Sequence, residues 1–308
     1  MVVDIFLDSP DTEAYKRHKV IISGGTTNPS LMSNMGIANN KYEQHCREIL
    51  NILDGGVLSV EVTEIDPERM YEQAMRFHKW DDARIVVKIP APFYIDGNTA
   101  QRVDSKFAPG SPVFVDTIPV IARLAGEGVP LNITCGFGYE QAHAIAAAIT
   151  SGARKAKNPA KNNYFSMFWG RLLDGYVADK SRGFSQVFDR SDTERLIALS
   201  MAEVEEAARQ LEGSGIRLIL GSSRLPKVWE EAAKKEGDDK LMLLKREAFR
   251  AVLKVARPFN AVPTVPPALL EASRYHEGTS AALKGFVDEY IKLRDSRDKT
   301  FIKQYPVF

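Results

Sequence analysis

Several features that define specialised classes of protein are scarce in this sequence. Cys46 and Cys135 are its only cysteines, too few for a disulfide framework or a structural zinc site. Its 41 basic and 40 acidic residues leave a net charge of +1, so it has neither the basic field of a nucleic-acid-binding protein nor an acidic tail. We therefore expect no nucleic-acid partner.

Long apolar runs and metal-binding patterns are also missing. No run approaches the roughly 18 residues that a membrane helix needs, and the N-terminal residues lack the charged and then apolar layout of a signal peptide. The five histidines are scattered over predicted helices and form no ligand cluster. No Gly-x-Ser-x-Gly nucleophile elbow is present. The expectation is a cytoplasmic protein with no membrane contact and no metal.

What the sequence does contain is an alternation of strand and helix signals. Short runs rich in β-branched and aromatic residues predict eight strands, at 4–8, 20–23, 58–62, 85–90, 130–134, 164–169, 216–220 and 260–265. Amphipathic stretches predict helices at 40–53, 67–80, 115–126, 139–151, 191–213, 226–236 and 241–255, with further helices after residue 265. Asp192 is the predicted cap of the 191–213 helix, residues 24–29 a predicted turn, and residues 94–112 a predicted irregular loop.

Alternating strands and helices fit either a closed barrel or an open doubly wound sheet. The first strand lacks the Gly-x-Gly-x-x-Gly turn of a dinucleotide fold. Polar residues lie at the carboxyl ends of most predicted strands, and a closed barrel brings those ends to one mouth, where barrel enzymes carry their chemistry. We therefore predict an α/β fold, a single-domain (β/α)8 TIM barrel over residues 1–308, with extra helices and loops and a C-terminal helical extension.

Lys88 interrupts the apolar run Ile85–Pro90, which predicts a strand buried on both faces. Burial of a lone ammonium is costly, so a lysine in such a strand is expected to lose its proton and act as a nucleophilic amine. That is the requirement for a Schiff base with a carbonyl substrate. The alternative is a lysine whose stem packs while its charged head reaches solvent.

The other strand ends supply groups that such chemistry needs. Asp8 and Glu61 are candidate proton carriers, and Thr134 could position a water. Asn28 and Asn132 could hold substrate hydroxyls. Four further residues could bind a phosphate or a sulfonate of similar shape, since arginine's planar fork suits both: Ser166, Arg171, Ser222 and Arg224.

Each of these residues also has a purely structural explanation. Asp8 could cap the helix that begins near Pro10, and Glu61 could pair with a surface lysine. The Ser222–Arg224 segment could cap the helix beginning at Pro226. One shared site nevertheless explains better why all of them fall on strand carboxyl ends.

The sequence resembles transaldolases in blocks spread from Phe6 to Leu270. The blocks are Phe6–Asp8, Thr26–Leu31, Ser59–Val62, Ile85–Pro90, Asn132–Thr134, Ser166–Leu172, Ser222–Arg224 and Thr264–Pro267. Their order along the chain makes the resemblance specific, although any one block alone would be weak.

The resemblance implies a role for each matching residue. Lys88 matches the Schiff-base lysine, and Asp8 the acid that takes a proton from the hydroxyl at the bond being broken. Glu61 and Thr134 match the pair that holds a catalytic water. Residues matching the substrate-contacting positions are Thr27, Asn28, Asn132 and Phe137, and those matching the phosphate-binding set are Ser166, Arg171, Ser222 and Arg224.

The implied reaction transfers a dihydroxyacetone unit from a ketose phosphate to an aldose phosphate, with no metal or organic cofactor. Small-molecule sugar phosphates are the expected partners. A related branch, the fructose-6-phosphate aldolases, releases dihydroxyacetone and has glutamine and tyrosine where Glu61 and Phe137 align. Longer segments at 93–112, 154–163 and 226–258 leave open an unusual sugar phosphate or a sulfosugar. A sugar-phosphate-binding barrel without turnover is a third alternative, and the C-terminal helices could form a lid or a homo-oligomer interface.

Overall fold

The computed structural model describes residues 4–273 and contains a closed barrel of eight parallel strands. Around the barrel the strands run β1 (Phe6–Asp8), β2 (Gly24–Thr26), β3 (Val57–Glu61), β4 (Ile85–Pro90), β7 (Leu131–Gly136), β8 (Asn163–Phe168), β9 (Ile216–Gly221) and β10 (Val262–Val265). The last strand pairs with the first, which closes the sheet. The predicted (β/α)8 barrel is confirmed. The predicted C-terminal extension beyond residue 273 lies outside the described residues.

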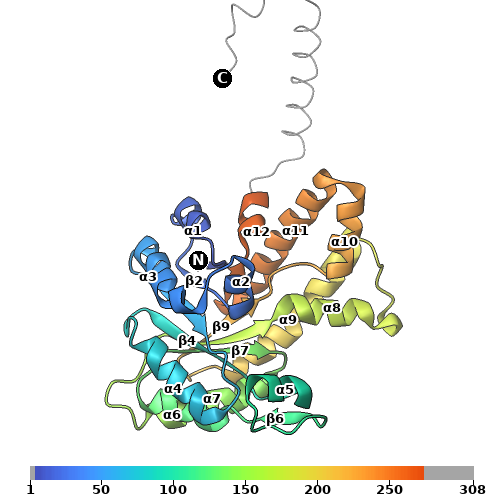
Figure 1. The fold of residues 1–308 in the computed structure, drawn as a ribbon. Coiled ribbons are helices and arrows are strands. Elements are labelled where there is room, and N and C mark those ends of the chain that lie inside the picture. The colour runs from blue at the N-terminus through green and yellow to red at the C-terminus, as the bar shows by residue number, and fades with distance from the viewer. Residues whose placement is uncertain (1–3, 274–308) are drawn as a thin grey trace, which may run out of the picture.

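Helices surround the barrel, and the blue N-terminal ones meet the orange C-terminal ones (Figure 1). They are α1 (Thr12–His18), α2 (Pro29–Asn34), α3 (Tyr42–Leu53), α4 (Pro67–His78), α6 (Ile118–Gly126), α7 (Tyr139–Ala153), α8 (Trp169–Ala178), α9 (Arg190–Gln210), α10 (Lys227–Glu236), α11 (Asp238–Ala256) and α12 (Pro267–Ala272). An ion pair between Arg17 of α1 and Glu271 of α12 joins the two ends of this ring.

Local chemistry explains where the helices begin. Asp11 and Asp66 cap α1 and α4 by accepting hydrogen bonds from the backbone of Glu13 and Arg69. Helix α9 was expected to be capped by Asp192, but its cap is Asp189. Asp192 instead accepts a hydrogen bond from the backbone of Ser185, so it fixes the preceding loop.

The second strand lies four residues later than the sequence predicts. Val20 and Ile21 are exposed in a turn after α1, whereas Gly24 and Gly25, expected in a turn, are in β2. Glycine is required there because an added Cβ at Gly25 would lie 2.3 Å from the Tyr15 hydroxyl. Tight packing against a buried tyrosine therefore replaces the usual β-branched side chain.

The segment expected to be an irregular loop, residues 94–112, is partly ordered. Strands β5 (Phe93–Ile95) and β6 (Val113–Val115) form an antiparallel pair, and helix α5 (Gly97–Val103) is part of the chain segment that connects them; α5 and β6 are labelled in Figure 1. Asp96 caps α5 by accepting hydrogen bonds from two backbone N–H groups. Helices α2 and α8 were not predicted; α8 contains Gly170 and Gly175, which weaken a helical pattern.

Candidate active site

The barrel interior has an apolar floor below a polar mouth. Side chains of strands that are not all neighbours meet in one cluster inside the barrel, namely Phe6, Val86, Tyr164, Ile219 and Val262. Because strand side chains alternate between faces, the residues two positions further also point inward. Those residues line a cavity at the carboxyl ends of the strands and are Asp8, Lys88, Ser166, Gly221 and Thr264.

Strand register brings the predicted catalytic residues together. Lys88 pairs laterally with Glu61 of β3 and with Asn132 of β7, so the three side chains lie in one layer. The Nζ atom of Lys88 is 3.2 Å from a carboxylate oxygen of Glu61 and donates a hydrogen bond to the carbonyl of Thr27 at 3.3 Å. Lys88 is only 7% exposed.

These neighbours change the expected charge of Lys88. Burial lowers the pKa of its amine, but the negative charges of Glu61 and Asp8 and the hydrogen bond to Glu61 outweigh burial and leave the pKa raised above its ordinary value. The amine is therefore protonated at neutral pH. The prediction of an uncharged lysine treated the buried ammonium as unpaired and did not include its ion pair with Glu61.

Asp8 is held by a neighbouring strand. The hydroxyl of Thr26 donates a hydrogen bond of 2.7 Å to one of its carboxylate oxygens, and the two residues are register partners. Both line the cavity. The Asp8 carboxylate thus faces the site in one orientation and does not cap the helix that follows, which Asp11 caps.

Asn132 and Ser166 belong to a buried hydrogen-bond chain. Ser166 donates to the side-chain carbonyl of Asn132 at 2.7 Å, and the Asn132 amide donates to Ser59 at 3.1 Å. A serine hydroxyl has a single proton. While Ser166 holds Asn132, it therefore offers only acceptor lone pairs to the cavity that it lines.

Two threonine hydroxyls near Lys88 have no nitrogen or oxygen partner within residues 4–273. The Oγ1 atoms of Thr27 and Thr134 are buried without a hydrogen bond to a nitrogen or oxygen of these residues, and the hydroxyl of Thr134 interacts only with the neighbouring Cys135 thiol. Thr134 lines the cavity and precedes Cys135, whose φ of 60° is left-handed and lies at a register shift between β7 and β8. Buried polar atoms normally find a partner, so both hydroxyls are positioned to bind water or a ligand.

The opposite side of the cavity carries an arginine and a serine of the predicted phosphate-binding set. Arg171 and Ser222 line it, from the first turn of α8 and from the end of β9. The guanidinium of Arg171 lies 4.9 Å from the ring centre of Phe168, which also lines the cavity. The cavity volume is about 160 Å³.

Arg224 has a different environment from Arg171. Its guanidinium makes a bidentate ion pair with Asp174 of α8, and Arg224 does not line the cavity. Sequence reasoning did not anticipate Asp174, because nothing in the local pattern distinguishes it from a surface residue of α8.

Of two residues predicted to contact substrate, Asn28 lies at the cavity and Phe137 does not. Asn28 lines the cavity, but its side-chain oxygen also caps α2 by accepting a hydrogen bond from the backbone of Leu31. Phe137 is 44% exposed, packs edge-on against Phe168 with ring centres 5.9 Å apart, and does not line the cavity. The cavity residues that the sequence analysis missed are Thr26, Phe168, Gly221 and Thr264. The period of two from the apolar floor would have found Gly221 and Thr264.

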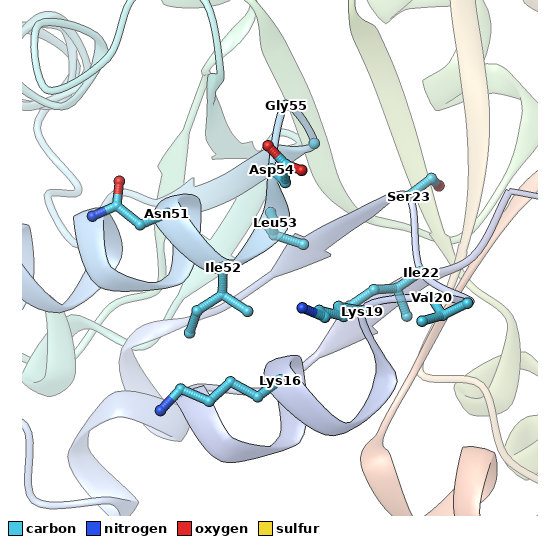
Figure 2. Close-up of a pocket in the computed structure, with 11 residues that line it drawn as sticks. Lys16, Lys19, Val20, Ile22, Ser23, Asn51, Ile52, Leu53, Asp54 and Gly55 are labelled. Atoms are coloured by element: carbon cyan, nitrogen blue, oxygen red, sulfur yellow. The ribbon is translucent and has the colours of Figure 1, made fainter.

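A larger cavity, of about 710 Å³, lies at the other face of the barrel (Figure 2). Lys16 of α1 and Asp54 in the loop after α3 border it, near the amino ends of β2 and β3. It contains none of the predicted site residues, and this face of a barrel serves stability more than chemistry. Among the described residues no cluster of three His, Cys, Asp or Glu side chains could hold a metal, and no helix is long and apolar enough to cross a membrane.

Comparison with known proteins identifies relatives. A "Probable transaldolase" of Lactiplantibacillus plantarum is 32% identical over 222 residues, covering 70% of this chain and 83% of that protein. One from Dehalococcoides mccartyi is 32% identical over 172 residues, but the chain spans only 62% of that protein and the match 55% of this chain. One from Nitrosopumilus maritimus is 25% identical over 292 residues, covering 94% of this chain and 96% of that protein.

Among solved structures, a glycoside hydrolase of family 5 from Prevotella bryantii B14 aligns over 88% of this chain and 94% of its own chain. The TM-score is 0.45 and the identity 9%, so this structure supports no inference. The sequence model described as "Transaldolase/Fructose-6-phosphate aldolase" matches residues 5–305, almost the whole chain. The chain therefore belongs to the transaldolase/fructose-6-phosphate aldolase family.

Proposed function

We propose that this protein is a Schiff-base transaldolase that moves a dihydroxyacetone unit from a ketose phosphate to an aldose phosphate. The observation that carries the proposal is the buried pair of Lys88 and Glu61, 3.2 Å apart, beside a cavity that Asp8 and Arg171 also line. A lysine held next to a carboxylate has an immediate acceptor for the proton that it must lose before it attacks a carbonyl.

The first step forms the imine. Glu61 takes a proton from the Lys88 ammonium, and the neutral amine adds to the carbonyl carbon of the ketose. One proton of the attached nitrogen passes to the former carbonyl oxygen, and Glu61 returns the proton that it took. That oxygen then leaves as water, and the protonated Schiff base remains. The buried hydroxyl of Thr134, which bonds to no nitrogen or oxygen of the described residues, is suited to orienting that water.

The second step breaks and remakes a carbon–carbon bond. The Asp8 carboxylate, oriented by Thr26, takes the proton of the hydroxyl on the leaving carbon. The bond electrons pass into the imine, and an aldose phosphate leaves as an aldehyde. Addition of the enamine to an acceptor aldehyde, with the proton returned by Asp8, and hydrolysis of the imine complete the transfer. Asn28 and Asn132 would hold the hydroxyls of the bound three-carbon unit.

A second candidate is an aldolase that releases free dihydroxyacetone. The family model that matches the chain covers both activities. Glu61 favours the transferase by resemblance, whereas Phe137 lies outside the cavity and does not separate the two alternatives. An assay of free dihydroxyacetone with and without an aldose phosphate acceptor distinguishes them, because a transferase needs the acceptor for turnover.

Borohydride trapping tests the proposal directly. Reduction of the imine formed with fructose 6-phosphate should attach a three-carbon adduct to Lys88, seen by peptide mass spectrometry. The Lys88→Ala variant should give no adduct, and Lys16→Ala, which alters a surface lysine in α1, should react like the parent protein. An adduct on another lysine, or none at all, would refute the proposal.

A further inference from the structure

Asp174 of α8 connects two segments at the anion-binding side of the barrel. One carboxylate oxygen accepts hydrogen bonds from Arg224 Nη1 at 2.8 Å and from the backbone N–H of Lys227 at 2.9 Å. The other oxygen accepts from Arg224 Nη2. Asp174 therefore fixes the Arg224 guanidinium and the first turn of α10 together.

The contacts of Arg224 occupy only part of its guanidinium. Of the five N–H groups of an arginine, two on Nη1 donate to Asp174 and to the carbonyl of Leu225, and one on Nη2 donates to Asp174. The Nε–H and the second Nη2–H have no hydrogen-bond partner in the described part of the chain. These two donors lie along one edge of the planar group, a fork that matches two oxygens of an anion.

The backbone around Arg224 is tightly packed against α8. A Cβ added at Gly170 would lie 2.0 Å from the carbonyl of Ser222 and 2.9 Å from Cγ of Arg224. Ser222, which lines the cavity, has a left-handed φ of 56°. The close approach of α8 therefore holds both the Ser222 turn and the stem of Arg224.

The ion pair is partly shielded from solvent. The Arg224 side chain is 16% exposed and the Asp174 side chain 31%. Burial raises the pKa of Asp174, but the hydrogen bonds from Arg224 and the Lys227 backbone outweigh it, so the pKa is lowered and the carboxylate stays charged. A fully exposed surface pair would not restrict an arginine in this way.

We propose that Asp174 is a positioning residue, which holds one edge of Arg224 so that the free edge can bind the anionic group of the substrate. This inference rests on the proposed function in one respect: the substrate carries a phosphate or a similar oxyanion. Arg171, which lines the cavity, then contacts the anion from α8. Arg224 lies just outside the lining, two residues after the lining residue Ser222 and against Gly170, and would contact the anion from the loop after β9.

Binding of fructose 6-phosphate to a protein that carries Lys88→Ala, measured by calorimetry, tests the inference without turnover. Asp174→Ala should weaken binding of fructose 6-phosphate about 10-fold or more, because the charge-assisted contact between Arg224 and the anion is lost. Asp174→Glu should restore part of it. Asp179→Asn, at the end of the same helix beside Arg182, is the matched control and should bind like the parent.

A double-mutant cycle separates positioning from a general structural effect. If Asp174 acts through Arg224, adding Asp174→Ala to an Arg224→Ala protein should change the affinity less than about twofold. An additive loss of affinity would overturn the inference. So would a loss of similar size when Asp174→Ala is made in a protein that retains Lys88 and dihydroxyacetone is trapped, because dihydroxyacetone has no anionic group.

The outcomes also separate this inference from the proposed function. If fructose 6-phosphate binds as expected but no adduct forms at Lys88 in the parent protein, the transaldolase proposal fails and the role of Asp174 stands. If the Lys88→Ala protein binds neither fructose 6-phosphate nor inorganic phosphate, the role of Asp174 is refuted, whatever Lys88 does.

Discussion

The Nζ atom of Lys88 lies 3.2 Å from a carboxylate oxygen of Glu61, and the two residues are register partners on adjacent strands. This pairing keeps the lysine charged despite its burial. A charged amine cannot attack a carbonyl, so Glu61 both stabilises the resting ammonium and is the nearest acceptor of its proton. In the proposed mechanism the reactivity of Lys88 therefore depends mainly on the carboxylate of Glu61.

Replacing that carboxylate tests its two effects. In Glu61→Gln, the pKa of Lys88 should fall, because a cause that raises it is removed, and the pH dependence of adduct formation with dihydroxyacetone should move to lower pH. At the same time the turnover rate should fall by about 10²–10⁴-fold through loss of the proton acceptor. Glu64→Gln, in the loop that follows β3, is the control. An unchanged pH profile would contradict the proposed role of Glu61.

The hydrogen bond from Thr26 to Asp8 should matter for bond cleavage and not for imine formation. Thr26→Val keeps the shape and removes the donor, which costs about 1.5–3 kcal/mol for a bond to a charged group, or roughly 10- to 100-fold in rate. Thr26→Ser should restore most of the activity. Transfer assays run beside borohydride trapping would show this split, and equal loss in both assays would count against it.

Two glycines of α8 allow a matched test of how closely this helix packs against the Ser222–Arg224 segment. Gly170→Ala should destabilise the protein by about 1–3 kcal/mol and weaken binding of the phosphorylated substrate, because its Cβ meets the Ser222 carbonyl at 2.0 Å. At Gly175 nothing lies within 4 Å of an added Cβ, so alanine there should stabilise the helix by about 0.5–1 kcal/mol. Urea unfolding and KM measurements check both, and similar behaviour of the two variants would rule out the packing argument.

Asp174 should also contribute to acid sensitivity. Its pKa is lowered from the ordinary 3.8, so its stabilising contribution is complete above that value and is lost as the pH falls through the lower folded value. The difference in free energy of unfolding between the parent and Asp174→Asn should therefore shrink below pH 3.8. Asp116→Asn, which alters the carboxylate that accepts from the backbone of Ile118, serves as the comparison. A constant difference from neutral to acid pH would argue against the pairing.

Much of the barrel could be predicted because its strands follow simple patterns. The run Ile85–Pro90 is buried along its length, and the strand is where the sequence places it. The position of β2 could not be predicted from local sequence. Its two glycines are required because the side chains of Phe6 and Tyr15, from other elements, leave no room for a Cβ atom. The ordered segment between β5 and β6 was missed for a similar reason, since glycine and proline there mark helix and strand ends and not disorder.

The residues of the site also divide into those that the sequence predicted and those that it did not. Asp8, Lys88, Thr134, Ser166 and Ser222 were expected at one mouth, and they line one cavity. Phe137 was expected to contact substrate and lies outside that cavity, while Phe168 lines it. Phe168 continues the period of two that begins with Tyr164 and Ser166 in β8, whereas Phe137 lies beyond the last residue of β7, where strand alternation no longer applies.

The sequence by itself determined the family, the order of the eight barrel strands, and the presence of polar side chains at strand carboxyl ends, because each depends on residues close together in the chain. Only the tertiary structure decided which partner each group has. Ser166 holds Asn132 from 34 positions away and Asp174 holds Arg224 from 50. Charge state and orientation come from such distant contacts, so the Glu61 partner of Lys88 and the Asp174 partner of Arg224 became evident only in the folded barrel.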